Sequence, residues 1–362
     1  MSKEDAMKSF SPPNLESTRF ASHYELARLP YFDLDEQDEL VLADPDAGPV
    51  VDTHTHLALG FLGKMRVDLE AEHPRPQLYL PFDASLDLDV YANRNFTPEL
   101  MKRMKLDLTL KSMTSGGLRA THTLPNLRRE MTKLGVKLSV LLPIDLPLIS
   151  DNAGAYLDVV SRKGEGRFLS FGSVHPYEPG SLAAKLDRQV ALGAKGIKYH
   201  PATQMVYPDA KRGMELYRLC GERNLPVLWH CGPVGIEPPA GRRRSQVYRY
   251  EKPIAENPNT TFVLGHSGAL QLDQGIALAN RYPNAYLEIA SQGLSGVRTI
   301  IEDAPIDRIM FGSDWPFYHQ ATGLAKVLLA TEDAPEARRA LLSANADRLF
   351  GLMPSQAEEV SR

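Results

Sequence analysis

Two histidines one residue apart, His54 and His56, are the first side chains in this sequence whose spacing could do chemistry. In an extended segment alternate side chains point to the same side, so both imidazoles project together and Thr55 points away. Their Cα atoms would lie ~6–7 Å apart, close enough for the two rings to bind one metal ion. Asp52 lies on the same side and could reach a ligand or the layer beneath. Alone, the pair is only moderately specific, and a structural role is an equal alternative.

Three later residues could complete a metal site. His230 ends a buried apolar run, where a core histidine with satisfied hydrogen bonds is the alternative interpretation. His266 has glycines nearby and could bind the metal, or act beside it as an acid-base group. Asp314 could be a hard oxygen ligand and could also accept a proton from metal-bound water. The hypothesis is therefore a metal site begun by His54 and His56 and completed by His230 and Asp314, with His266 either a further ligand or an acid-base group beside the metal.

These side chains lie where short apolar runs, rich in β-branched residues, end. The predicted strands are Val50–His54, Val136–Pro143, Phe168–His175, Gly196–His200, Pro226–His230, Thr261–His266, Ala285–Ala290 and Arg308–Ser313. The clearest amphipathic helices between them are Gly180–Leu192, Ala210–Arg223, Leu270–Tyr282 and Leu294–Asp303. Eight strand–helix units in about 300 residues predict an α/β fold, a TIM (β/α)₈ barrel, whose strand ends converge on one face. No glycine-rich nucleotide-binding motif follows any strand.

The barrel is predicted over residues 49–353, with an extension before it and a short tail after it. Residues 1–48 are polar and interrupted by proline, and they could wrap the domain or contact a second subunit. Residues 57–135 form an unusually long insertion after the first strand, where it could wall or cover a pocket. Residues 354–362 form the C-terminal tail.

Composition indicates an ordinary soluble globular protein. The chain has 362 residues, 43% of them hydrophobic, and a net charge of -4, which gives no support to nucleic-acid binding. No apolar run is long enough to span a membrane, and no secretory signal is visible. The two cysteines, Cys220 and Cys231, favour a reducing compartment, so we expect a cytoplasmic protein. The sequence is consistent with either a monomer or a homodimer.

Together these residues resemble the amidohydrolase superfamily, in particular the branch with aminocarboxymuconate-semialdehyde decarboxylase and the dicarboxylate lactonases. The motifs that carry the resemblance are Val51-Asp52-Thr53-His54-Thr55-His56, Gly196-Ile197-Lys198-Tyr199-His200-Pro201, Val227-Leu228-Trp229-His230, Leu264-Gly265-His266-Ser267-Gly268, Phe311-Gly312-Ser313-Asp314-Trp315-Pro316 and the terminal Asn345-Ala346-Asp347-Arg348-Leu349-Phe350-Gly351-Leu352. The resemblance covers the chain from about Val50 to Leu352 and implies a distorted TIM barrel.

The resemblance also implies a cofactor and roles for the site residues. His54, His56, His230 and Asp314 would bind one divalent metal ion, most often zinc, and His266 would be the neighbouring catalytic imidazole. The metal would lower the pKa of a bound water toward neutrality. Binuclear relatives use a carboxylated lysine on the fourth strand, so Lys198 could bridge a second ion; the favoured alternative is one ion, with Lys198 paired to a carboxylate.

Substrate contacts are predicted at residues near the same strand ends. His200 and Lys198 share one side of the fourth strand. Arg242 and Arg244 belong to a run of three arginines that could hold a substrate carboxylate, although a solvated basic loop is the favoured alternative. Trp315 could form an aromatic wall or pack the last loop.

Two enzymatic functions and one non-enzymatic function are consistent with these motifs. The leading hypothesis is hydrolysis of an amide, lactone or ester of a small molecule that could carry a carboxylate. The second is non-oxidative decarboxylation of an unsaturated or aromatic acid with the same metal set. The third is a catalytically silent barrel, against which the complete ligand set argues. The motifs serve both reactions, because the difference lies in how the substrate is held.

Overall fold

The eight predicted strands form a closed barrel of parallel strands. The computed structural model describes residues 18–352. Its barrel strands are β4 (Val50–Thr55), β6 (Val136–Leu141), β7 (Phe168–Ser170), β8 (Ile197–Tyr199), β9 (Val227–His230), β10 (Phe262–Gly265), β11 (Ala285–Glu288) and β12 (Ile309–Met310). Each lies within its predicted segment or within one residue of it, and most are shorter than predicted.

The strands fall into two ladders that meet at both edges. One ladder has the order β4-β6-β7 and the other β12-β11-β10-β9-β8, and every neighbouring pair is parallel. Parallel bridges between Gly172 and Ile197, and between Thr55 and Trp315, join the ladders. The predicted TIM-barrel fold is therefore confirmed, and all strands end at the same face.

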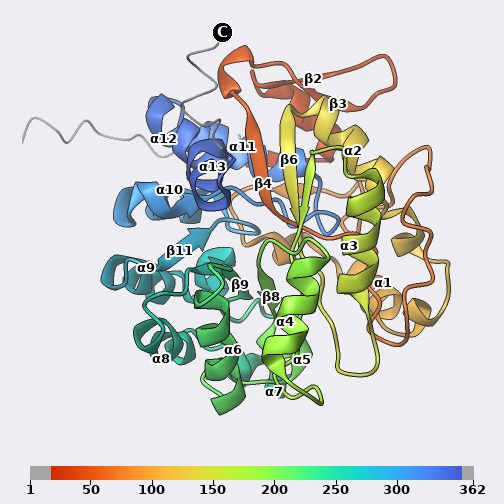
Figure 1. Cartoon of the computed structure of the whole chain (residues 1–362). Coiled ribbons are helices and arrows are strands. Elements are labelled where there is room, and N and C mark those ends of the chain that lie inside the picture. Colours follow the sequence, from red (N-terminus) through yellow and green to blue (C-terminus); the bar gives the residue numbers. More distant parts are fainter. Residues whose placement is uncertain (1–17, 353–362) are drawn as a thin grey trace, which may run out of the picture.

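Helices surround the strands (Figure 1). The helices that alternate with the barrel strands along the chain are α2 (Leu124–Lys133), α3 (Asn152–Lys163), α4 (Leu182–Ala191), α6 (Lys211–Gly221), α8 (Tyr248–Glu256), α9 (Leu272–Arg281), α10 (Leu294–Asp303) and α11 (Gln320–Ala330). The C-terminal segment adds α12 (Pro335–Arg339), a π-helical turn (Ala340–Ala344) and α13 (Asn345–Phe350). The four helices named from the sequence are confirmed, with ends that differ by at most two residues. No helix among residues 18–352 is long and apolar enough to cross a membrane.

The long segment after β4 is ordered by its own contacts and by the N-terminal extension. It contains α1 (Pro98–Leu108), which begins at the capping side chain of Thr97, and the short strand β5 (Leu86–Asp87). Strand β1 (Arg19–Phe20) pairs antiparallel with β5, so the extension adds a strand to the insertion. The extension continues with a 3₁₀ helix (His23–Arg28) and a hairpin of β2 (Phe32–Leu34) and β3 (Leu40–Leu42). The predicted tail, residues 354–362, lies outside the described residues.

The interior of the barrel is apolar below the site. Buried side chains from the strands, such as Val140, Leu228, Val263 and Met310, form one cluster that packs against Phe350. Because alternate residues of a strand share a side, Leu228 lies one layer below His230. The apolar layer therefore supports the polar side chains above it.

Candidate metal and catalytic site

A cavity of about 350 Å³ opens where the strands end, and most of the predicted site residues line it. Seven of the ten are in the lining: His54, His56, Lys198, His200, His230, His266 and Asp314. They come from β4, β8, β9 and the segments that follow β10 and β12. The barrel thus brings together residues that are far apart in the sequence, as strand ends in this fold do.

Hydrogen bonds at Nδ1 orient the rings of His54 and His56. Nδ1 of His54 lies 2.6 Å from Oε2 of Glu288, and Nδ1 of His56 lies 2.6 Å from the carbonyl oxygen of Leu142. Both partners are acceptors, so each Nδ1 carries the proton and each Nε2 keeps a lone pair. This is the arrangement that orients histidine ligands for a metal ion.

The Nε2 atoms of both histidines face the carboxylate of Asp314. Oδ1 of Asp314 lies 3.4 Å from Nε2 of His56 and 3.8 Å from Nε2 of His54. Oδ2 of the same carboxylate accepts a hydrogen bond from the hydroxyl of Ser291 at 3.2 Å. The backbone N–H of Asp314 donates to the carbonyl of His54 at 2.8 Å, which joins the last strand end to the first. Oδ2 of Asp314 therefore accepts a hydrogen bond from Ser291, while Oδ1 faces the Nε2 atoms of His54 and His56.

His266 is positioned as a neutral base beside this cluster. Its Nδ1 lies 3.2 Å from the carbonyl oxygen of Ala290, which accepts the proton and leaves a lone pair on Nε2. Burial lowers the pKa of His266 to about 4, an effect that the charge of Asp314 partly offsets. Its ring centroid lies 4.7 Å from those of both His54 and His230. The ring is thus unprotonated at neutral pH and adjacent to the predicted ligands.

His230 offers a buried nitrogen that has no partner. Its Nε2 makes no hydrogen bond to the described residues, and the residue is 7% exposed. Its ring stacks on that of His200, with centroids 4.0 Å apart and planes 8° from parallel. Burial lowers the pKa of His230 well below its usual range. A buried ring nitrogen without a hydrogen-bond partner carries an energetic cost unless a ligand or an ion binds to it.

Lys198 is a buried lysine next to the histidines. Its Nζ lies 3.2 Å from Nε2 of His54. Burial lowers the pKa of Lys198, whereas the charges of Asp314 and Glu288 raise it. His200, two residues later, accepts a hydrogen bond at Nδ1 from the backbone N–H of Thr203 at 3.3 Å. The other ring nitrogen of His200 therefore carries its proton, and the residue lines the cavity.

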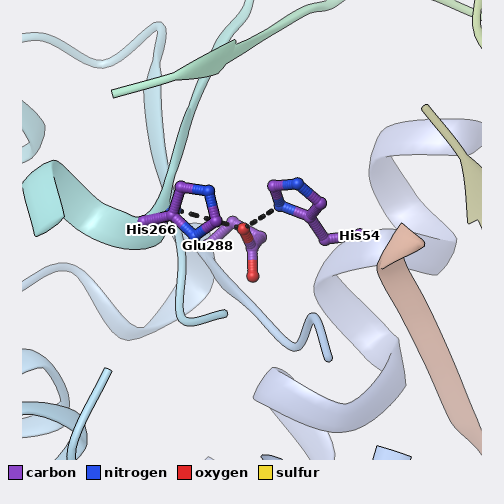
Figure 2. Close-up of side chains that lie close together, drawn as sticks. All are labelled: His54, His266 and Glu288. Carbon is purple, nitrogen blue, oxygen red and sulfur yellow. Dashed lines mark hydrogen bonds and ion pairs between the residues drawn. The ribbon is translucent and has the colours of Figure 1, made fainter. Parts of the chain in front are cut away.

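Glu288, like Ser291, is a site residue that sequence reasoning missed. It ends β11 with 0% exposure, and besides His54 it accepts the backbone N–H of His266 at 3.2 Å (Figure 2). Burial raises the pKa of Glu288, and hydrogen bonds from the N–H groups of Ala290 and His266 partly offset that rise. A signal was present, because Glu288 is the one acidic residue in the apolar run Ala285–Ala290. A carboxylate in such a run needs partners when it is buried.

Backbone strain is concentrated at the same place. His266, Ser291 and Asp314 have φ values of 63°, 66° and 63°, in the left-handed region that side chains rarely adopt. Such conformations cost about 1–3 kcal/mol each and persist where the surrounding structure imposes them, which is typical of functional sites.

The residues present fit a divalent metal ion. Three donors, Nε2 of His54, Nε2 of His56 and an oxygen of Asp314, lie within 4.8 Å of one another. The unpaired Nε2 of His230 is a fourth donor at the same cavity. Imidazole and carboxylate are the ligands that zinc and similar ions take in catalytic sites.

Three predicted substrate contacts are not among the described residues that line the cavity. Arg242 and Arg244 lie on the short helix α7 (Pro239–Arg244), where Arg242 is exposed and Arg244 stacks on the ring of Tyr207. Trp315 is fully buried, and its Nε1 donates to Glu130 at 3.1 Å. This placement gives no support to a role of the three in binding substrate.

The fold and the site together define a TIM-barrel protein with a buried cluster of histidines and carboxylates at its strand ends. A sequence model of the family described as "Amidohydrolase" matches residues 150–352, more than half of the chain. The chain therefore belongs to the amidohydrolase family, as the motifs predicted, and the members of this family are enzymes. A comparison with curated proteins gave no match.

Solved structures with the same fold include both decarboxylases and a hydrolase. The 2,6-dihydroxybenzoate decarboxylase from Rhizobium is 18% identical, with a TM-score of 0.54 over 83% of this chain and 99% of that chain. The 5-carboxyvanillate decarboxylase from Novosphingobium aromaticivorans, solved with manganese, is 15% identical, with a TM-score of 0.55 over 85% and 97%. A probable 2-pyrone-4,6-dicarboxylic acid hydrolase from Acinetobacter baumannii is 12% identical, with a TM-score of 0.51 over 84% and 100%. At these identities the likeness shows the fold.

Proposed function

We propose that this protein is a metal-dependent hydrolase that cleaves an amide, lactone or ester bond in a small organic molecule. The observation that carries the proposal is the convergence of His54 and His56 on one oxygen of Asp314, beside the unpaired Nε2 of His230. This donor set supports one divalent ion, with zinc as the first candidate; manganese in a protein of the same fold makes it the second.

The bound ion would supply Lewis acidity, which lowers the pKa of water toward neutrality and polarises a carbonyl group. The neutral ring of His266 has a free Nε2 that can accept a proton from the attacking water. Oδ2 of Asp314, held by Ser291, can hold a proton during the transfer to the leaving group. Lys198 and the N–H of His200 are donors on the cavity side for the substrate oxygen that becomes negative.

Decarboxylation of an aromatic or unsaturated acid is the second candidate. It is favoured by Lys198, a buried ammonium that could meet the carboxylate that leaves, and by the two decarboxylases among the structures of the same fold. In that reaction a protonated His266 or Asp314 would return a proton to the substrate carbon.

Metal analysis of the purified protein, joined to a substrate panel, tests the proposal. We expect about one equivalent of divalent metal, loss of activity with a chelator and its recovery when zinc or manganese is returned. Less than about half an equivalent, with activity indifferent to chelators, would contradict the metal assignment.

The panel pairs hydrolysis of phenyl acetate and dihydrocoumarin with CO₂ release from 2,6-dihydroxybenzoate. Cleavage without CO₂ release supports hydrolysis, and the opposite result supports the second candidate. His56→Ala should abolish both metal binding and activity. The matched control is His73→Ala, because the side chain of His73 lies outside the lining described for this cavity.

A further inference from the structure

The wall of the cavity beyond the metal-binding residues is apolar. Two segments form most of it: the insertion, through Phe61, Met104 and Leu108, and the loop between β9 and α7, through Val234 and Ile236. The aliphatic and aromatic groups of this wall face the space that the part of a substrate remote from the reacting bond would occupy. Contact with them favours an apolar group by about 25 cal/mol for each Å² removed from water.

Two polar side chains on this wall, Asn93 and Glu237, have partners within the protein, whereas the buried hydroxyl of Tyr91 has none among the described residues. The amide of Asn93 donates to the carbonyl of Val234 at 3.1 Å and accepts from the hydroxyl of Tyr318 at 2.6 Å. The carboxylate of Glu237 accepts the N–H groups of Val234 and Gly235 at 2.6 and 2.8 Å. Both side chains hold the loop after β9 through these hydrogen bonds.

The charged side chains of the lining differ between the metal-binding residues and the apolar wall. Among the described residues of the lining, Lys198 is the one lysine or arginine, and it lies beside His54. Glu237, on the loop between β9 and α7, is the charged residue of the apolar wall. Lys105 donates to the carbonyl of Ile236 at 3.1 Å, but it is exposed and outside the lining. An anionic group on the remote part of a substrate would thus be desolvated without a counter-charge and would face a carboxylate.

From this distribution we infer that the substrate carries an apolar, uncharged group of about the size of one ring on the side remote from the reacting bond. The cavity selects against a carboxylate at that end. The inference rests on the proposed function, since it takes the metal-binding end as the place of reaction. Ile236 and Glu237 are the residues that set the selectivity.

Binding of two hydroxamates to the metal-loaded protein tests the inference without catalysis. A hydroxamate chelates the ion and points its ring at the wall. We expect 4-isopropylbenzohydroxamic acid to bind at least about tenfold tighter than 4-carboxybenzohydroxamic acid in calorimetry. Equal or tighter binding of the carboxylated compound overturns the inference, and so does failure of both compounds to bind. Absence of bound metal contradicts the inference and the proposed function together.

Kinetics with two esters separate the inference from the proposed function. Phenyl acetate and 4-acetoxybenzoate share the reacting bond and differ by one carboxylate. If the protein hydrolyses both esters but prefers the carboxylated one, the inferred selectivity is overturned and the proposed hydrolase function stands. If the protein discriminates between the hydroxamates but hydrolyses neither ester, the proposed hydrolase function is contradicted and the inferred selectivity stands.

Two substitutions should shift the relative affinity for the two hydroxamates toward the carboxylated compound. Ile236→Arg adds a cation to the wall and should shift the ratio of the two hydroxamate affinities toward the carboxylated compound by at least about fivefold. Its control, Ile236→Leu, should keep the wild-type preference. Glu237→Gln removes the repulsion and keeps one of the two acceptor oxygens that hold the loop, so the ratio should shift the same way even if Ile236→Arg does not fold. Unchanged ratios in both charge variants overturn the roles given to these residues.

Discussion

Oε2 of Glu288 lies 2.6 Å from Nδ1 of His54, so a carboxylate at the end of the seventh barrel strand orients a histidine at the end of the first (Figure 2). The same oxygen also accepts the backbone N–H of His266. One buried carboxylate therefore fixes the ring of a predicted ligand and the backbone of a predicted base. Glu288 acts on the site through these two residues.

Glu288→Gln should weaken metal binding. The amide removes the negative charge opposite the N–H of His54, which lowers the basicity of Nε2 and loosens the ring. Loss of such a partner typically reduces metal affinity by about 10–100-fold. Competition with a chromophoric chelator measures this affinity, and Glu302→Gln, an exposed residue of α10, is the control. An affinity within about twofold of the wild type would contradict the positioning role.

Ser291 combines a strained backbone with a hydrogen bond to Asp314, and two substitutions separate these features. Ser291→Ala and Ser291→Gly both remove the hydroxyl that holds Oδ2, so both should lower kcat by about tenfold. Only glycine relieves the left-handed backbone at φ 66°, so the glycine variant should be more stable than the alanine variant by about 1 kcal/mol. Urea unfolding and steady-state kinetics measure the two effects. Equal stability of the two variants would show that the backbone stores no strain there.

The sequence predicted the barrel and most of the residues at its centre for a physical reason. Each strand is buried on both faces, so it reads as an apolar run, and a polar residue such as His230 at the end of that run stands out. Parallel strands then bring these ends together irrespective of their distance in the sequence. This convergence is why His54 and His56, only moderately specific as a pair, could be interpreted as part of a metal site.

The parts that the sequence did not predict depend on contacts without a local pattern. Glu288 lies inside a predicted strand, and only the fold shows that its partner is His54. The wall combines Met104, on α1 in the insertion, with Ile236, on the loop after β9, and both segments lie outside the strand–helix repeat. The path of the insertion depends on buried hydrogen bonds. The guanidinium of Arg119, for example, is buried and donates to the carbonyl of Leu59 at 2.9 Å.

Removal of the arginines on α7 should leave the kinetics nearly unchanged. Arg242 is exposed, and Arg244 packs on Tyr207 and donates to the carbonyl of Ala240 at 2.8 Å. We therefore expect Arg242→Ala to change KM by less than about twofold, and Arg244→Ala to lower stability by about 1 kcal/mol through lost packing. Initial rates and thermal unfolding measure these effects. A rise in KM of about tenfold or more, confined to carboxylated substrates, would restore the sequence-based hypothesis that these arginines bind a carboxylate.

His23 in the N-terminal extension should make the protein sensitive to acid. Its side chain is fully buried, and neither ring nitrogen has a hydrogen-bond partner among residues 18–352. Burial lowers the pKa of His23 from 6.5 to about 4. Between these two pH values the unfolded chain binds a proton that the folded protein does not, so the free energy of unfolding falls as the pH falls from 6.5 to 4.

His23→Phe should remove this contribution and keep the ring contact with Phe82, whose centroid lies 6.2 Å away. We expect the wild type to lose about 2 kcal/mol more stability than the variant between pH 7 and pH 4.5, as measured by urea unfolding at both values. His73→Phe is the control and should follow the wild-type pH dependence. Parallel losses in wild type and His23→Phe would mean that His23 is protonated in the folded protein, and that the extension opens to water in acid.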